Sequence, residues 1–172
     1  MQILLHQNEL VMRLTKKHLM CSITRAKIFR LYAAISYTNK SYYRFGHKES
    51  PKCTFCEEPK QDFIHLFITC PAVIKFREEL EGVWKEKLTG KEWFFGNAHN
   101  SQSFLIRESN LFIHANNWAG KTLNLHEFKA YISAKEKIEA EIAKKRNKVC
   151  DHINIWEHRL KMMDLGQNEE NN

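Results

Sequence analysis

Three cysteines and one histidine gather in residues 53–70, with the spacing Cys53-x2-Cys56-x8-His65-x4-Cys70. Zinc binds thiolate sulfur and imidazole nitrogen at about 2.0 to 2.3 Å, and a structural site takes four such ligands in a tetrahedron. Two cysteines separated by two residues can hold one ion from a tight turn, and His65 and Cys70 can reach it from a helical or turn-like segment. The pattern therefore predicts a structural Zn²⁺ site that leaves no open position for a catalytic water.

Two other interpretations of these cysteines stay open at the level of sequence. Free cysteine is among the most buried residue types, so the thiols could be core residues and His65 a polar residue on an apolar face. A disulfide is less favoured, because disulfides persist mainly in secreted proteins. The chain opens without the charged region, apolar region and small-residue cleavage site of a secretory signal peptide. We accordingly expect an intracellular protein, in the nucleus, the cytoplasm or both.

The positive charge of the chain is concentrated near its N-terminus. The formal net charge is +7, with a pI near 9.2. Residues 1–52 contain ten Lys or Arg and two Glu, an excess of +8, so the other 120 residues sum to −1. Such a concentrated excess is typical of a phosphate-binding surface. The alternative is a solvated face that serves solubility.

Aromatic and cationic residues alternate just before the cysteines, over residues 38–48. Aromatic rings can stack on unpaired bases while Lys and Arg neutralise phosphates, so this run suits RNA or single-stranded DNA. Alternatively, Tyr42, Tyr43 and Phe45 pack under the metal loop as a small core. Within the basic residues 13–52, the candidate nucleic-acid contacts are Arg25, Arg30, Lys40, Tyr42, Tyr43, Arg44, Lys48 and Lys52.

A second basic cluster lies near the C-terminus, at Lys144, Lys145, Arg146 and Lys148. Four cations within five residues on a helix can lie against a phosphate backbone. A solvated helix surface is the equal alternative.

Apolar residues at helical spacing predict the elements on both sides of the cluster. Helices are expected over 8–20 and from residue 22 to about 36–39. After the cluster, Pro71 suits the first turn of a helix that continues to a stop near Gly90.

Three further signals cover the C-terminal half. A helix is expected from about 101 to 117, followed by turn residues at 119–122. Asn124 has the position of a helix N-cap. Residues 125–156 contain neither proline nor glycine and carry an apolar stripe, so they predict one long helix that could pack against a partner polypeptide.

These predictions combine into a mainly α fold, in which amphipathic helices flank a small CCHC zinc module and a long helix ends the chain. Hydrophobic residues make up 43% of the 172 residues, with six glycines and three prolines, as expected of a folded helical chain. No apolar run approaches the 18 residues that cross a membrane. We divide the chain into a basic helical segment (1–52), the zinc module (53–70), a helical C-terminal segment (71–163) and a disordered tail (164–172).

The cluster resembles the zinc-binding region near the C-terminus of LINE-like, non-LTR retrotransposon reverse transcriptases. The resemblance rests on Ser50–Cys56 and His65–Pro71. Flanking segments that are similar to the family are Thr38–Lys40, Phe45–Gly46, Asn110–Phe112, Glu127–Ile132 and Glu139–Ala143. The resemblance implies a C-terminal fragment that holds RNA or DNA, with the family's zinc ligands at Cys53, Cys56, His65 and Cys70.

The catalytic residues of such a polymerase are missing from this sequence. Metal-assisted phosphoryl transfer needs clustered carboxylates, and the chain has no Tyr/Phe-x-Asp-Asp sequence. A nuclease built from His47, His99, His114 and His126 is a weaker alternative, because scattered histidines are usually surface or core residues. We therefore expect a non-enzymatic zinc module that binds nucleic acid. The main alternative is a helical protein-interaction module, which could dock on a polymerase body.

Overall fold

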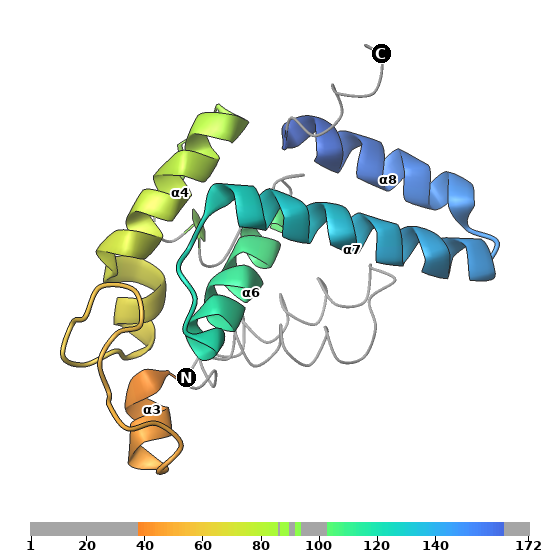
Figure 1. The fold of residues 1–172 in the computed structure, drawn as a ribbon. Coiled ribbons are helices and arrows are strands. Elements are labelled where there is room, and N and C mark those ends of the chain that lie inside the picture. The colour runs from red at the N-terminus through yellow and green to blue at the C-terminus, as the bar shows by residue number, and fades with distance from the viewer. Residues whose placement is uncertain (1–37, 86, 90–91, 94–102, 164–172) are drawn as a thin grey trace, which may run out of the picture. The chain divides into compact units, whose positions relative to one another are not determined.

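The structure is a computed structural model of the 172-residue chain, and it describes residues 38–85, 87–89, 92–93 and 103–163. The described residues are mainly helical and include no strand, which confirms the predicted mainly α class. The predicted helices over 8–20 and 22–39, and the tail at 164–172, lie outside the described residues. The elements are α3 (Asn39–Arg44), the π-helical turn η1 (His65–Thr69), α4 (Pro71–Trp84), α6 (Ser103–Ala119), α7 (Leu125–Lys145) and α8 (Val149–Met162) (Figure 1).

The chain divides into two compact units. Of the described residues, the first unit contains 38–74, 88–89, 92–93 and 103–122, and the second contains 75–85, 87 and 123–163. The cysteine cluster, α3, η1 and α6 belong to the first unit. Helices α7 and α8 belong to the second unit, and α4 begins in the first and ends in the second.

Helix α6 supplies much of the buried interior of the first unit. Its buried positions include apolar residues such as Leu105 and Ile113, both at 0% exposure, but polar ones as well. Arg107 and Glu108 form a buried ion pair with a 3.1 Å separation. Asn110 donates a 2.9 Å hydrogen bond to the carbonyl of Trp93. Because buried polar groups need such partners, α6 is fixed by specific contacts as well as by apolar packing.

Helix α4 begins at Pro71, as predicted, and the backbone N–H of Ile74 donates to the carbonyl of Cys70 at its first turn. The helix ends at Trp84, earlier than the predicted stop near Gly90. Lys85 has φ of 56°, in the left-handed region that an α-helix cannot continue.

Asn124 caps the N-terminus of α7 as predicted. Its side-chain oxygen accepts from the backbone N–H groups of His126, at 2.7 Å, and Glu127, at 3.3 Å. Two buried residues of α7, Phe128 and Ile132, are fully enclosed. The ring of Phe128 meets that of Phe76, on the α4 part of the same unit, edge to face at 5.7 Å.

The prediction of one helix over 125–156 is wrong. The chain turns back after Lys145, and α8 starts at Val149 and runs beside α7 (Figure 1). Asn147 adopts φ of 54°. The N–H of Lys148 donates to the carbonyl of Ala143, and that of Asn147 donates to the carbonyl of Lys144. These two bonds form a Schellman motif, in which asparagine takes the place that glycine usually fills.

Polar side chains join the two arms of this α7–α8 hairpin. Trp156 donates a 3.0 Å indole hydrogen bond to Glu139, and the ring nitrogen of His152 lies 3.0 Å from Glu136. Arg159 lies 3.9 Å from Glu139. Among the described helices, none is both long enough and apolar enough to cross a membrane.

Candidate metal centre

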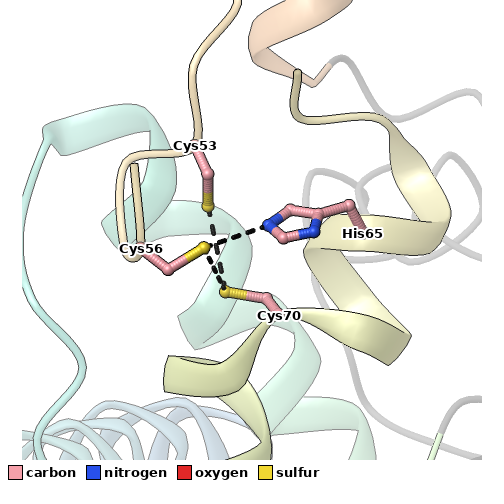
Figure 2. Close-up of side chains that lie close together, drawn as sticks. All are labelled: Cys53, Cys56, His65 and Cys70. Atoms are coloured by element: carbon pink, nitrogen blue, oxygen red, sulfur yellow. Dashed lines mark hydrogen bonds between the residues drawn. The ribbon is translucent and has the colours of Figure 1, made fainter. Parts of the chain in front are cut away.

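The four predicted ligand residues lie together in the first unit (Figure 2). Their ligand atoms all fall within 4.8 Å of one another. The Sγ of Cys70 is 3.8 Å from that of Cys53 and 3.7 Å from that of Cys56. The Nε2 of His65 is 3.3 Å from the Sγ of Cys56. The sulfur atoms are not joined as disulfides, and the group can hold a metal ion.

A tight turn presents the first two ligands. The backbone N–H of Phe55 donates to the Sγ of Cys53 at 3.4 Å, and the N–H of Cys53 donates to the carbonyl of Glu58. Glu57 has φ of 60°, so the chain reverses through the left-handed region directly after Cys56. The reversal closes the turn around both sulfur atoms.

A π-helical turn presents the other two ligands. The N–H of Cys70 donates to the carbonyl of His65 at 2.8 Å, which is the i to i+5 bond of a π-helix. In an α-helix, residues five apart point about 140° away from each other. The wider turn brings His65 and Cys70 to one side, where both face the same point (Figure 2). The side chain of Asp62 accepts from the N–H of His65 and stabilises the start of this turn.

Gln61 lies next to Cys53 and is completely buried. Its Nε2 donates to the Sγ of Cys53 at 3.2 Å and to the Oδ1 of Asn117 at 2.9 Å. Its Oε1 accepts from the backbone N–H of Asn39 at 3.1 Å. Gln61 thus connects one ligand with the start of α3 and the end of α6.

Asn39 is the second buried residue of this network. Its Nδ2 donates to the carbonyl of Lys52 at 2.6 Å and to the hydroxyl of Thr54 at 2.9 Å, so α3 is tied to the metal loop. The ammonium of Lys48 donates to the Oδ1 of Asn39 at 2.7 Å and to the carbonyl of Asn117 at 3.4 Å. Burial lowers the pKa of Lys48, and the charge of Cys53 opposes that change.

The hydrogen bonds around Cys53 favour its thiolate form. The side-chain bond with Cys70 is the largest cause that lowers the pKa of Cys53 to about 4, and Gln61 adds to it while burial opposes it. The same bond raises the pKa of Cys70, because Cys70 supplies the shared proton. A metal ion bound at this cluster would take the place of such protons, since metals bind thiolates.

The other predicted contact residues of the first unit lie on or beside α3. Lys40, Tyr43, Arg44 and Lys52 are exposed, and Tyr42 is half-buried. The guanidinium of Arg44 lies 5.5 Å from the ring centre of Phe45. The predicted contacts Arg25 and Arg30 lie outside the described residues.

The second basic cluster occupies the turn of the α7–α8 hairpin, in the second unit. All four of its cations are exposed, and Lys144 pairs with Glu141 at 2.7 Å. The turn places these cations at the end of the hairpin, whereas the sequence predicted a continuous helix there. The cluster residues are Lys144, Lys145, Arg146 and Lys148.

The histidines of the nuclease alternative do not assemble in the part of the chain that the structure describes. There, the cysteine cluster is the group that can hold a metal, and it includes none of His47, His114 and His126. His99 lies outside the described residues. The chain matches no family model, no curated protein and no solved structure.

Sequence reasoning did not single out Gln61, Asn117 and Trp118. Gln61 and Asn117 are polar residues whose burial depends on contacts between distant segments. Trp118 packs against Tyr42 with ring centres 4.5 Å apart, and 55% of its surface is exposed. Its position at the end of a predicted helix, next to turn residues, was the one available signal.

Proposed function

We propose that the cluster binds zinc and that the first unit is a zinc-stabilised module that binds single-stranded nucleic acid beside the metal. Ligand chemistry supports zinc, since thiolates and imidazole select it over magnesium and calcium, which prefer oxygen. Geometry supports it too. A tetrahedral zinc site separates its sulfur atoms by about 3.8 Å and a sulfur from a nitrogen by about 3.6 Å. Two sulfur–sulfur distances here are 3.7 and 3.8 Å, one sulfur–nitrogen distance is 3.3 Å, and all four ligand atoms lie within 4.8 Å of one another.

The proposed role of the zinc is structural. The four side chains supply a full tetrahedral set, so no ligand position is left for a substrate water. The ion would join a turn at Cys53 and Cys56 to the start of α4 at Cys70. Because the unfolded chain lacks such a site, the free energy of zinc binding also stabilises the folded module.

One observation carries the proposal of nucleic-acid binding. Tyr43 and Phe45 are 52% and 53% exposed, and they alternate with the exposed cations Lys40 and Arg44. A small core beneath the metal loop would enclose these rings, whereas a surface that stacks bases and pairs phosphates leaves them accessible. Residues 39–52 also contain four Lys or Arg and one Glu.

The resemblance to the C-terminal zinc region of LINE-like reverse transcriptases supports the same function. We infer that the chain is a non-catalytic part of such a protein and contacts template RNA or target DNA.

The second basic cluster, on the α7–α8 turn, is a further candidate contact surface, because its cations are exposed.

A binding titration over a range of salt concentrations tests this function. The full chain is mixed with labelled single-stranded RNA and DNA, and Lys40→Gln/Arg44→Gln is compared with the control Lys75→Gln/Lys137→Gln, which removes the same charge from exposed positions elsewhere. Binding should weaken with salt, and the slope of log K against log salt should fall by about 1.4 in the first variant. No binding at low salt, or equal slopes in both variants, would contradict the proposal.

A protein-interaction module is the second candidate function. Ile138 on α7 and Ile153 on α8 are 62% and 53% exposed, so the hairpin presents apolar side chains to solvent. Exposed apolar surface of this kind marks interaction sites when it is contiguous. If the chain binds no nucleic acid, Ile138→Ser/Ile153→Ser should be tested for loss of binding to a polymerase body.

A further inference from the structure

Trp118 differs from the other three tryptophans of the chain in its exposure. Trp84, Trp93 and Trp156 are exposed by 9%, 2% and 2%, whereas 55% of the Trp118 surface is accessible. Tryptophan and tyrosine are enriched at interfaces, so an exposed indole that packs against a tyrosine ring is a candidate contact for a ligand. The ring of Trp118 contacts that of Tyr42, and its backbone lies in the last turn of α6.

Two helix ends place Trp118 against Tyr42. At the end of α6, Gly120 has φ of 67° and the N–H of Lys121 donates to the carbonyl of Asn116. At the end of α3, Gly46 has φ of 72° and the N–H of His47 donates to the carbonyl of Tyr42. Both ends have the bond of a Schellman motif, which fixes the last helical turn. The two rings meet at 4.5 Å with a tilt of 47°.

A hydrogen-bond network beside the cysteine cluster links the end of α6 to the start of α3. Asn117, directly before Trp118, is 1% exposed and accepts from Gln61, which in turn donates to the ligand Cys53. Asn39, at the start of α3, receives a 3.4 Å bond from Asn117. A buried, hydrogen-bonded network of this kind has little freedom to rearrange. The ring pair is therefore a preformed surface.

We propose that Trp118 and Tyr42 form a stacking site for an unpaired nucleobase. This inference rests on the proposed function and specifies how the nucleic acid is held. Stacking on an exposed indole accepts any base, because every base has a π-face. The exposed cations Arg44 and Lys121 lie within three residues of the two rings in sequence and can pair with the phosphates on either side of the stacked base.

The charge around the rings favours nucleic acid over an apolar peptide. The rings of His47 and Tyr42 meet edge to face with their centres 6.3 Å apart, and the charged residues nearest to Tyr42 and Trp118 in sequence are basic. An apolar peptide would leave these cations without partners, whereas a phosphate backbone would neutralise them.

Tryptophan fluorescence tests the site in the full, metal-loaded chain. The probes are a thymidine oligonucleotide and an abasic oligonucleotide of equal length, which has the same phosphates and no bases. The thymidine oligonucleotide should quench the emission of the one exposed tryptophan, and it should bind about tenfold or more tightly than the abasic one. In Trp118→Leu this preference should fall to about twofold or less, while Trp118→Phe should retain most of it.

The outcomes separate this site from the function on which it rests. Equal affinity for both oligonucleotides in the parent chain, or a preference that survives in Trp118→Leu, would overturn the stacking site and leave nucleic-acid binding intact. Failure to bind either oligonucleotide would overturn both. Because Trp118 is half exposed, its variants should keep the metal content and helical circular dichroism of the parent, which confirms that the folded module is being compared.

Discussion

At the scale of single residues, a glutamine contacts the four predicted ligands of the candidate metal centre through Cys53. Gln61 donates to the Sγ of Cys53 and is fully buried between this ligand and Asn117. Groups that hydrogen-bond to ligands orient them and tune their basicity. We therefore expect Gln61 to fix the position of the Cys53 thiolate in the metal-free chain as well.

Replacing Gln61 should weaken metal binding without removing a ligand. Gln61→Met keeps the length of the side chain but loses both donated hydrogen bonds and the one accepted from Asn39, so metal affinity should fall about 10- to 100-fold. Competition with a chromogenic chelator measures the change. Lys60→Met, at the exposed neighbouring position, is the control and should bind the metal as the parent does. Equal affinities in the two variants would rule out this role for Gln61.

The cluster of Cys53, Cys56, His65 and Cys70 could be predicted from the sequence, whereas the position of Gln61 beside it could not. Cys53, Cys56, His65 and Cys70 are few in type and close in sequence, so their chemistry is visible in the spacing. Gln61 gains its role from Asn117, which is 56 residues away. No local pattern encodes a contact that depends on how α6 packs against the metal loop.

At the scale of elements, short irregular turns position the functional side chains. The π-helical turn η1 brings His65 and Cys70 to one side of the chain, and left-handed residues end α3, α6 and α7. The glycines at two of these ends could be predicted from composition. The turn at Asn147 was missed because asparagine is a weaker stop signal than glycine, and the flanking residues are strong helix formers.

Asn147 should determine whether α7 and α8 form a hairpin. An alanine in the left-handed region destabilises the fold by about 1 kcal/mol, whereas glycine adopts this region without a steric penalty. Asn147→Ala should therefore lower the midpoint of thermal unfolding by about 2 to 4 °C, while Asn147→Gly should leave it close to that of the parent. Circular dichroism measures both midpoints. If Asn147→Ala is as stable as the parent and Asn147→Gly is less stable, the hairpin is refuted.

At the scale of the whole molecule, the cysteine cluster and the second basic cluster lie in different units. The first unit contains the cysteine cluster and the exposed rings of Tyr43, Phe45 and Trp118. The second contains the α7–α8 hairpin with its basic turn. The mainly α class followed from the periodicity of apolar residues. The two-unit division did not, because it depends on how α4 is shared between distant segments.

The zinc content of the purified chain tests the central claim most directly. Elemental analysis of the parent should find about one zinc per chain, since one tetrahedral set is present. Cys56→Ser and His65→Ala should each lose the zinc and part of the helical signal, because the metal contributes folding free energy. Cys150→Ser, at an exposed cysteine outside the cluster, should keep both. A parent chain without zinc, or unchanged zinc content in Cys56→Ser and His65→Ala, would contradict the account.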